Sequence, residues 1–281
     1  MFRFGIRGKF KKILGLPEIP RRRIASYLKR MGCVDLPKRT PGDANTIAII
    51  IPCYRHESYL ETTFSCIINQ TRKPDHVVFV NDASPDGTEK VLKELIRTCV
   101  FSEEIDFSIL TNKSNVGQSM SLNRGIQSIN DDLIMVLNDD DYLMHDAVEI
   151  VANLFSRNQD VFLIGSSNIE FSSDEELASG TKMIQELAPS GLLQLTRHSP
   201  NDVVDFRNYN DLNMTHSGSC FLKAAWHAVG GYLPKGRKRV VPFSDRDFQL
   251  RLNALFPVAI SYEIPFVYWR NNSSFDKGIN S

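Results

Sequence analysis

The chain has 281 residues, which is enough for one large α/β domain or two small ones with a buried core. Its 42% hydrophobic content is ordinary for a globular protein and excludes a wholly disordered chain. The formal net charge is zero, but residues 1–45 hold twelve Lys or Arg against three Asp or Glu, so they carry +9 and the rest carries −9. This asymmetry predicts a basic N-terminal arm and linker over residues 1–45, attached to a mildly acidic body.

Cysteine usage and hydropathy indicate the compartment. The cysteines are odd in number and form no C-x-x-C pair, at Cys33, Cys53, Cys66, Cys99 and Cys220. This pattern argues against a disulfide framework and a structural zinc site, and it is typical of a reducing compartment. No apolar run approaches the ~18–20 residues that span a bilayer, and the N-terminus lacks the continuous apolar stretch of a secretory signal. We therefore expect a cytoplasmic protein.

The arm interleaves basic and apolar side chains. On a helix, Phe2, Ile6 and Phe10 share one broad face, although Phe4 falls opposite and weakens the pattern. Apolar and cationic side chains together are typical of a segment that lies on an anionic membrane surface, so we expect residues 1–30 to attach the protein peripherally to the inner face of the membrane. A tail that only improves solubility is the alternative. Nucleic-acid binding is not predicted, because the main body lacks both interleaved aromatic residues and a basic surface.

From residue 46 onward, apolar runs alternate with segments of helical spacing. Short strands are predicted over residues 46–52, 76–82, 107–112, 133–138 and 161–167. Helices are predicted between them, over residues 57–70, 84–99, 117–129 and 145–157, with Ser84 as a candidate N-cap and Pro85 in the first turn. The alternation suits βαβ units, and continuously apolar strands indicate a sheet covered on both faces. We expect a parallel α/β sheet over about residues 46–166.

The pattern changes after this region. Residues 170–215 are polar and show no clear period. Residues 218–233 predict a strand and a short helix that stops at Gly230-Gly231, and residues 244–256 predict an amphipathic helix. Residues 257–270 predict either two strands or one strand bent around Pro265.

Polar or aromatic residues follow four successive predicted strands. Ligands of open parallel sheets bind beyond the carboxyl ends of the strands, so these residues are the candidates for a ligand site. They are Pro52 and Tyr54 after the first strand, Asp82 after the second, Asn115 and Gly117 after the third, and Asp139, Asp140 and Asp141 after the fourth. No G-x-G-x-x-G and no G-x-x-x-x-G-K-[ST] follows the first strand, which excludes a dinucleotide fingerprint and a P-loop.

Three adjacent acids, Asp139 to Asp141, come directly after an apolar strand. Adjacent carboxylates repel one another unless a cation or an array of donors lies between them. Carboxylate oxygens suit a divalent cation such as Mg²⁺ or Mn²⁺, which in turn would balance the charge of a diphosphate. The acid run therefore predicts a metal site at the strand end, and a solvated acidic turn is the alternative.

Five segments in order resemble glycosyltransferase family 2, the inverting enzymes of the GT-A fold. They are IAIIIPCYRHESYLETTFSCIINQT, VFVNDASPDGT, NVGQSMSLNRGI, LNDDDYL and FSDRDFQLRL. The resemblance implies one domain over residues 46–281, with a nucleotide-sugar half over 46–166 and an acceptor half over 167–281. The implied fold is a Rossmann-like, mostly parallel sheet with helices on both faces. The chain departs from the family at Asn138, where many members begin D-x-D, and at Ser244, which is often Glu.

The resemblance implies a metal-dependent, inverting transfer of a sugar from a nucleoside diphosphate sugar to a hydroxyl group. A saccharide or lipid-linked acceptor, in the synthesis of cell-surface polysaccharide or glycolipid, is the expectation. Asp82 would accept a hydrogen bond from a ring N–H of the base, which favours UDP and allows GDP or dTDP. The remaining implied roles are nucleobase contact for Pro52 and Tyr54, nucleotide contact for Asn115 and Gly117, ribose contact for Asp139, and metal binding for Asp140 and Asp141.

Asp245, at the start of the late helix, is the implied catalytic base that takes the proton of the acceptor hydroxyl. A carboxylate there would also complement the helix dipole without any catalytic role. Asp247 is the alternative base, and His216 is a candidate contact of the acceptor. Asp141 would either support the metal through water or cap the following helix.

Two other functions remain open on the sequence alone. A non-catalytic nucleotide-sugar-binding member of the family would be consistent with Asn138. A sugar nucleotidyltransferase also uses acid-bound metal on an α/β sheet, but it would need a Gly-rich loop with Arg and Lys where this chain has PCYRHESY.

Overall fold

The computed structural model describes most of the body of the protein and two short strands outside it. The described residues are 46–101, 103–173, 175–177, 194–200, 212, 214–237, 239 and 243–270, with the backbone of β1 (Ile19–Pro20) and β10 (Val203–Val204), which pair antiparallel. Apart from β1, the predicted basic arm and its membrane-binding segment lie outside the described residues. Within the described part, no helix is both long and apolar enough to cross a membrane.

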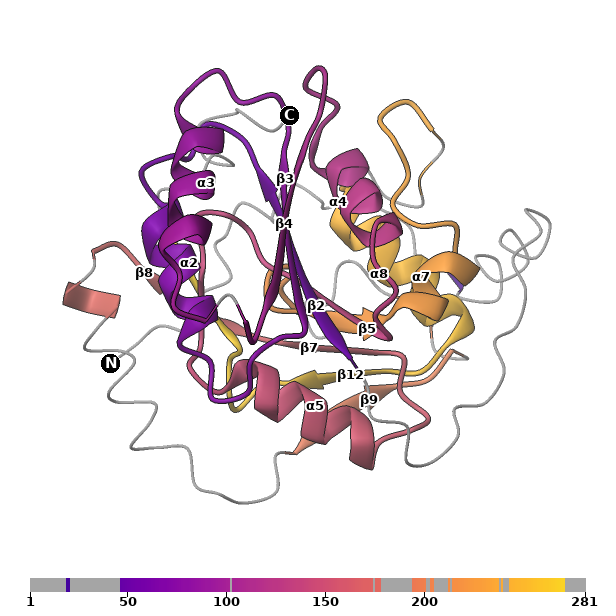
Figure 1. Cartoon of the computed structure of the whole chain (residues 1–281). Coiled ribbons are helices and arrows are strands. Elements are labelled where there is room, and N and C mark those ends of the chain that lie inside the picture. The colour runs from indigo at the N-terminus through magenta and orange to yellow at the C-terminus, as the bar shows by residue number, and fades with distance from the viewer. Residues whose placement is uncertain are drawn as a thin grey trace.

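An eight-stranded sheet forms the centre of the described structure, in the order β4-β3-β2-β5-β11-β7-β12-β9 (Figure 1). Its strands are β2 (Ile47–Cys53), β3 (His76–Asn81), β4 (Asp106–Thr111), β5 (Leu133–Val136), β7 (Leu163–Ser166), β9 (Leu195–His198), β11 (Cys220–Leu222) and β12 (Val258–Ser261). All run parallel except β11 and β9. The mostly parallel α/β sheet predicted from the sequence is therefore confirmed.

The five strands predicted over residues 46–166 are parallel to one another, as expected, but they are not contiguous in the sheet. Strand β11, from the C-terminal half of the chain, inserts antiparallel between β5 and β7. Cys220 pairs with both Met135 and Ile164, so strands from the two halves alternate in one sheet. The apolar pattern of β11 is the same whichever way the strand runs, and so the sequence carried no signal for this insertion.

Helices cover both faces of the sheet (Figure 1). On one side lie α2 (Leu60–Ile68), α3 (Thr88–Thr98) and α5 (Ala147–Arg157), and on the other lie α4 (Gln118–Gln127), α7 (Lys223–Ala228) and α8 (Ser244–Leu255). This double cover explains why every residue of β2 is buried. Buried Gln70, after α2, donates to the Met144 carbonyl and accepts from the Val148 N–H, and these bonds join α2 to the start of α5.

Helix α3 begins later than the sequence predicted. Its first residue is Thr88 and its N-cap is Gly87, so Ser84 is not the cap. The Ser84 hydroxyl instead donates to the Cys53 carbonyl across the loop. Asp86 serves the helix start, because its Oδ1 accepts from both the backbone N–H and the hydroxyl of Thr88. A Ser-Pro-Asp-Gly sequence offers two capping side chains, and contact with the neighbouring loop decides between them.

A small three-stranded sheet lies beside the central one and consists of β6 (Tyr142–Leu143), β13 (Val267–Arg270) and β8 (Asn168–Phe171). Residues 257–270 therefore form two strands that belong to different sheets, and the single bent strand is excluded. Because β6 directly follows the acid run, this small sheet connects β13 to the residues around Asp140.

Helix α4 approaches the central sheet closely at Gly125. A Cβ atom at this position would lie 2.6 Å from Ile50 Cγ2 on β2 and 3.0 Å from Val80 Cγ2 on β3. The absence of a side chain thus lets α4 pack directly on these strands, which places its N-terminal end at the carboxyl edge of the sheet.

We expect Gly125→Ala to lower the free energy of unfolding by about 1–2 kcal/mol. Because a contact of 2.6 Å is far too short, the overpacking cost lies toward the upper end of the usual range, at about 2–3 kcal/mol, and it outweighs the gain of about 1 kcal/mol in helix propensity. Urea denaturation measures the difference, with Gln127→Ala on the exposed face of the same helix as the control. Equal stability of the two variants would contradict the close packing.

Candidate active site

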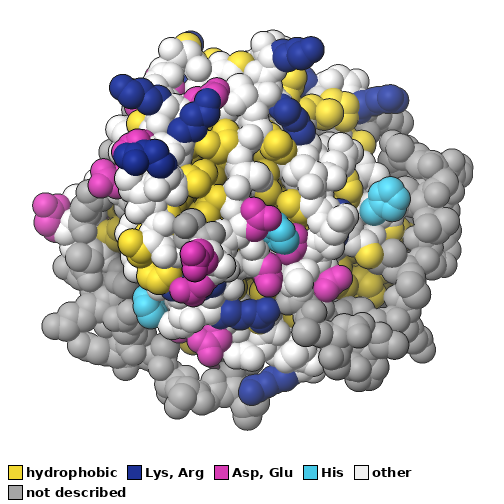
Figure 2. Space-filling view, viewed as in Figure 1, with side chains coloured by type: hydrophobic (Ala, Val, Ile, Leu, Met, Phe, Trp, Pro, Cys, Tyr) yellow, Lys and Arg dark blue, Asp and Glu magenta, His cyan; other side chains and the backbone are white. Residues whose placement is uncertain are grey.

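Loops after neighbouring strands meet at the carboxyl edge of the central sheet. Three hydrogen bonds join them: Tyr54 N–H to Asp139 Oδ2 (3.1 Å), Gly117 N–H to Asp82 Oδ2 (2.8 Å) and Gln118 Nε2 to Asn138 Oδ1 (2.9 Å). Figure 2 shows acidic side chains and a histidine gathered near the middle of the molecular surface in view. The structure therefore brings together the polar residues that the sequence placed at separate strand ends.

Asp82 organises the loop that leads into α4. Its carboxylate is 3% exposed and accepts from Asn112 Nδ2 (2.7 Å), Val116 N–H (2.9 Å) and Gly117 N–H (2.8 Å). Gly117 has φ +84° and ψ 159°, a conformation essentially restricted to glycine. The Asp82 carboxylate, which follows β3, thus binds the backbone N–H groups directly before α4, and the sequence did not reveal this pairing. Asn115 is exposed in the same loop, and the nucleotide contacts of these residues stay predictions.

Pro52 and Tyr54 lie at the end of β2. Pro52 is buried within the strand, and Tyr54 is half-buried beyond it. The Arg55 guanidinium lies 5.2 Å from the centre of the Tyr54 ring, and Arg55 itself has a positive φ of 61°. This loop holds an aromatic ring at the sheet edge, and the predicted contact of Pro52 and Tyr54 with a nucleobase remains to be tested.

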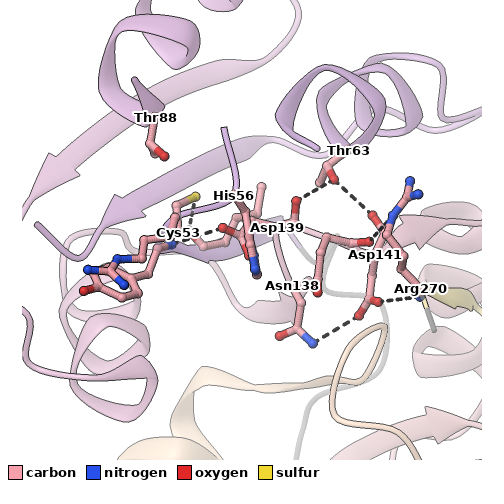
Figure 3. Close-up of polar contacts among 12 residues, drawn as sticks. Cys53, His56, Thr63, Thr88, Asn138, Asp139, Asp141 and Arg270 are labelled. Atoms are coloured by element: carbon pink, nitrogen blue, oxygen red, sulfur yellow. Dashed lines mark hydrogen bonds and ion pairs between the residues drawn. The ribbon is translucent and has the colours of Figure 1, made fainter. Parts of the chain in front are cut away.

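The acid run is tied to α2 and to the first loop (Figure 3). Asp139 is 5% exposed, and its Oδ1 lies 2.8 Å from His56 Nδ1. The Thr63 hydroxyl, on α2, lies 3.0 Å from the Asp139 carbonyl oxygen and 3.1 Å from that of Asp141. These contacts fix the backbone of the acid run, so the direction of each carboxylate is set by the fold.

Asp141 contacts a different set of groups. It is 1% exposed, its Oδ1 accepts from the Arg270 N–H (3.3 Å), and its Oδ2 accepts from Asn138 Nδ2 (3.1 Å). Burial and the charge of Asp140 raise the pKa of this carboxyl well above its usual value. The Asp141 carboxylate thus bonds to the backbone of the small sheet, and its predicted contact with a metal stays a prediction. Asp141 does not cap the next helix, because the N-cap of α5 is Asp146.

Among the residues that the structure describes, His56, Asp139 and Asp140 form a group that could hold a metal ion. One ligand atom from each lies within 4.8 Å of the others. Asp140 is 4% exposed, and its Oδ2 is buried with no hydrogen-bond partner in the described part of the protein. Burial and the charge of Asp139 raise the pKa of Asp140 to about 6. A buried carboxylate oxygen without a donor is stabilised by a cation, so these residues fit the predicted divalent metal. His56 was missed, although its place after the first strand was a usable signal.

The acid run shifts the pKa of the His56 imidazole. Burial by itself lowers the pKa of the imidazole, but the hydrogen bond to Asp139 and the charges of Asp139, Asp140 and Asp86 outweigh it, so the pKa is raised. Arg270 adds a second cationic group near the acid run. Its Nε donates to the Asp140 carbonyl (3.3 Å), and its guanidinium lies between the rings of Tyr59 (4.7 Å) and Phe171 (4.6 Å).

Asp245 and Asp247 have different environments at the start of α8. Asp247 is fully buried, and its Oδ2 accepts from Arg251 Nε (2.8 Å). Arg251 is also buried, and it donates to the carbonyls of Val229 (2.5 Å) and Gly231 (2.7 Å). Asp247 therefore links α8 to the Gly230-Gly231 turn and has no access to a substrate. Asp245 is half-buried and remains the candidate base.

His216 lies near the candidate base. Its Nε2 is 2.8 Å from the Tyr232 hydroxyl. Burial lowers the pKa of His216, partly offset by the negative charge of Asp245; burial and the same charge raise the pKa of Tyr232. The neighbouring Ser217 accepts from the Asn138 N–H (3.1 Å), which connects this side of the site to the acid run. The acceptor contact of His216 stays a prediction.

The twisted, mostly parallel sheet, its helices on both faces and the acid run at its carboxyl edge define the GT-A class of folds. A model of glycosyl transferase family 2 matches residues 48–224. Since this is more than half of the chain, the protein belongs to that family, as its motifs predicted.

Curated relatives cover parts of the chain. Glycosyltransferase GlyA of Streptococcus pneumoniae is 33% identical over 104 residues, which are 37% of this chain and 14% of that protein. Chondroitin synthase of Pasteurella multocida is 24% identical over 207 residues, which are 74% of this chain and 19% of that protein. Poly-β-1,6-N-acetyl-D-glucosamine synthase of Staphylococcus epidermidis is 24% identical over 112 residues, 40% of this chain and 26% of that protein. The chain spans less than a third of the length of these three relatives.

Solved structures share the fold at low identity. The structure of S. aureus TarS 1-349 in complex with UDP-GlcNAc has a TM-score of 0.58 and 12% identity, over 81% of this chain and 59% of that chain. The mannosyltransferase PcManGT of Pyrobaculum calidifontis in complex with GDP-Man and Mn²⁺ has a TM-score of 0.53 and 14% identity, over 88% of this chain and 64% of that chain. At these identities the likeness concerns the fold alone.

We expect Asp140→Asn to stabilise the metal-free protein at about pH 7. The raised pKa means that the folded state binds more protons than the unfolded state between the ordinary Asp value and about 6, so this group's contribution is present at low pH and lost as the pH rises through that window. Removing the charge should restore about 1–2 kcal/mol, or roughly 2–6 °C in Tm.

Thermal melts in EDTA at about pH 7 and about pH 5 measure this effect. The advantage of Asp140→Asn over the unsubstituted protein should shrink at the lower pH, where Asp140 is protonated anyway. Asp132→Asn, an exposed acid before β5, is the matched control and should change little. An Asp140→Asn variant less stable than the unsubstituted protein at about pH 7 would argue against a destabilising charge.

Proposed function

We propose that the protein transfers a sugar, with inversion at the anomeric carbon, from a nucleoside diphosphate sugar to a hydroxyl acceptor. The observation that carries this proposal is the buried, unpartnered Oδ2 of Asp140, which lies beside Asp139 and His56 at the carboxyl edge of the sheet. Membership of glycosyl transferase family 2 supports the reaction class. In this proposal residues 46–281 form one catalytic domain, with a nucleotide-sugar half over 46–166 and an acceptor half over 167–281.

The donor is proposed to be a UDP-sugar. Asp82 uses three hydrogen bonds to hold its loop, and a carboxylate has about four acceptor positions, so one remains for a ring N–H of the base. Uracil, guanine and thymine carry such an N–H, which leaves GDP and dTDP as the other donors to test. The related fold of TarS in complex with UDP-GlcNAc supports the choice of UDP. Tyr54 and Pro52 would border the base, and Asn115 and Gly117 would lie along the nucleotide.

The chain's own residues would do most of the chemistry. Asp245 takes the proton of the acceptor hydroxyl while that oxygen attacks the anomeric carbon, and a direct displacement of this kind needs one base. Burial of the Asp247–Arg251 pair holds the first turn of α8, and with it Asp245, against the Gly230-Gly231 turn. His216 is placed to contact the acceptor near this base.

The carboxylates of Asp140 and Asp139, which lie beside His56, would hold a divalent cation, Mn²⁺ or Mg²⁺. When bound, such a cation supplies positive charge that stabilises the departing nucleoside diphosphate. Arg270, held between two aromatic rings and bonded to the acid-run backbone, keeps the acid run in place. Asp139 would in addition reach the ribose.

The departure from D-x-D at Asn138 does not favour a non-catalytic role. Asn138 accepts from Gln118 Nε2 and donates to Asp141 Oδ2, so it links α4 to the acid run. In this proposal the metal is held by other residues, so the absence of an Asp at position 138 removes no ligand. The hydrogen bond between Asp247 and Arg251, in the same helix as the proposed base Asp245, also supports a catalytic role over a non-catalytic one.

Polysaccharide or glycolipid synthesis at the membrane is the proposed context. Relatives include a chondroitin synthase and a poly-β-1,6-N-acetyl-D-glucosamine synthase, whose names describe polysaccharide products. The basic and apolar residues of segment 1–30 would hold the enzyme at the inner face of the membrane, close to a lipid-linked or saccharide acceptor.

A donor screen tests the function. Purified protein with UDP-, GDP- and dTDP-sugars and Mn²⁺ is expected to release nucleoside diphosphate fastest from a UDP-sugar, and EDTA is expected to stop the release and to weaken UDP binding measured by calorimetry. Equal UDP affinity with and without EDTA would remove the metal from the proposal. UDP binding without turnover of any donor, whatever acceptor is supplied, would instead favour the non-catalytic alternative.

Two neighbouring variants test the base. Asp245→Asn should keep the stability and nucleotide affinity of the protein and lower kcat by about 10²-fold or more. Asp247→Asn should instead lower the free energy of unfolding by about 3–5 kcal/mol, because Arg251 would lose its buried partner. Full kcat in Asp245→Asn would be incompatible with its assignment as the base.

A further inference from the structure

His56 stands in an arrangement that is common for metal-binding histidines. Its imidazole is 11% exposed, comes from the loop between β2 and α2, and places Nδ1 2.8 Å from Asp139 Oδ1. Histidine ligands almost always use one ring nitrogen to donate to a carboxylate, a backbone carbonyl or water, which fixes the tautomer and leaves the other nitrogen for the metal. Within the described residues, Asp139 occupies Nδ1 and no hydrogen bond reaches Nε2.

The second side of the site is a carboxylate oxygen that lacks a partner. Asp140 Oδ2 is buried without a hydrogen-bond donor in the described part of the chain, and Asp140 as a whole is 4% exposed. Leaving a buried carboxylate oxygen unpaired is costly, and a cation between it and the imidazole would remove that cost. One imidazole nitrogen of His56 and one carboxylate oxygen each of Asp139 and Asp140 lie within 4.8 Å of one another, so the three side chains form a group that could hold one ion.

We infer that His56 is a direct ligand of the bound metal and makes this site select Mn²⁺ over Mg²⁺. This inference rests on the metal-dependent function proposed above, and it adds a nitrogen ligand from the first loop to the carboxylates of the acid run. Mg²⁺ prefers oxygen ligands and retains its waters, whereas imidazole suits transition-metal ions. Asp139 also orients His56 through Oδ1, and its Oδ2 accepts from the Tyr54 N–H.

A different role for His56 would give the opposite result. If its imidazolium served as a fixed cation that neutralises Asp139 and Asp140, it would compete with a metal for the same carboxylates. Removing the side chain would then strengthen metal binding. The sign of the change in metal affinity therefore separates a ligand from a competing counter-ion.

The test titrates MnCl₂ and MgCl₂ separately, without nucleotide, into the EDTA-stripped and dialysed full chain by calorimetry. The unsubstituted protein is expected to bind Mn²⁺ more tightly than Mg²⁺. His56→Gln is expected to lose about 10-fold to 100-fold in Mn²⁺ affinity and much less in Mg²⁺ affinity, so that the preference disappears. His227→Gln, an exposed histidine at the end of α7, is the matched control and should bind as the unsubstituted protein does.

Electron paramagnetic resonance of bound Mn²⁺ gives a readout independent of affinity. A directly coordinated imidazole nitrogen should appear as a ¹⁴N coupling to the metal, and it should be absent in His56→Gln and present in His227→Gln. Unchanged or tighter Mn²⁺ binding by His56→Gln, no Mn²⁺ binding by the unsubstituted protein, or a nitrogen coupling that survives the substitution would each overturn the inference.

A parallel arm with UDP separates this inference from the proposed function. Metal-dependent UDP binding that His56→Gln leaves intact, with unchanged preference for Mn²⁺, would overturn the role of His56 and leave the donor assignment standing. Selective Mn²⁺ binding that is lost in His56→Gln, in a protein that does not bind UDP, would support the metal ligand while the proposed function fails.

Discussion

The concentration of negative charge in one buried turn is the constraint on which the rest of the site depends. Three consecutive carboxylates at 1–5% exposure repel one another, and each needs its own compensation. The Asp139 carboxylate forms hydrogen bonds with the His56 imidazole and the Tyr54 N–H. The Asp141 carboxylate forms them with Asn138 Nδ2 and the Arg270 N–H. Asp140 Oδ2 has no hydrogen-bond donor in the described structure, so it is the carboxylate oxygen of the acid run whose negative charge is left uncompensated. The first loop and β13 are therefore arranged around the acid run, and the site retains a destabilised group where a ligand would bind.

The other side of the site is built on a buried ion pair. Arg251 and Asp247 are almost completely removed from water, which is costly, but the guanidinium also donates to two backbone carbonyls of the Gly230-Gly231 turn. A pair satisfied in this way locks the start of α8 to the segment that carries Tyr232. The hydrogen bonds of the pair offset the cost of its burial, and the half-buried Asp245, the proposed base, lies two residues before Asp247 in the same first turn.

Local patterns were sufficient for most of the secondary structure. The apolar runs and helical spacings predicted β2, β3, β4, β5 and β7 and the helices between them, because continuous hydrophobicity and amphipathic periodicity are properties of neighbouring residues. Where two local signals competed, contact with other loops decided: Asp86 and not Ser84 serves the start of α3, since the Ser84 hydroxyl bonds to the Cys53 carbonyl. The antiparallel insertion of β11 had no local signal at all, because strand pairing joins residues far apart in the chain.

By itself the sequence determined the fold class, the family and the edge of the sheet at which polar residues gather, since strand order along the chain and βαβ connectivity place those residues together. Only the tertiary structure decided what each acid does. Asp140 and Asp141 are adjacent and chemically identical, yet one has an oxygen without a donor while the other bonds to Asn138 and the β13 backbone. Asp245 and Asp247 differ in the same way, through the distant turn that Arg251 reaches. The role of a carboxylate depends on burial and on its donors, and both are supplied by residues remote in sequence.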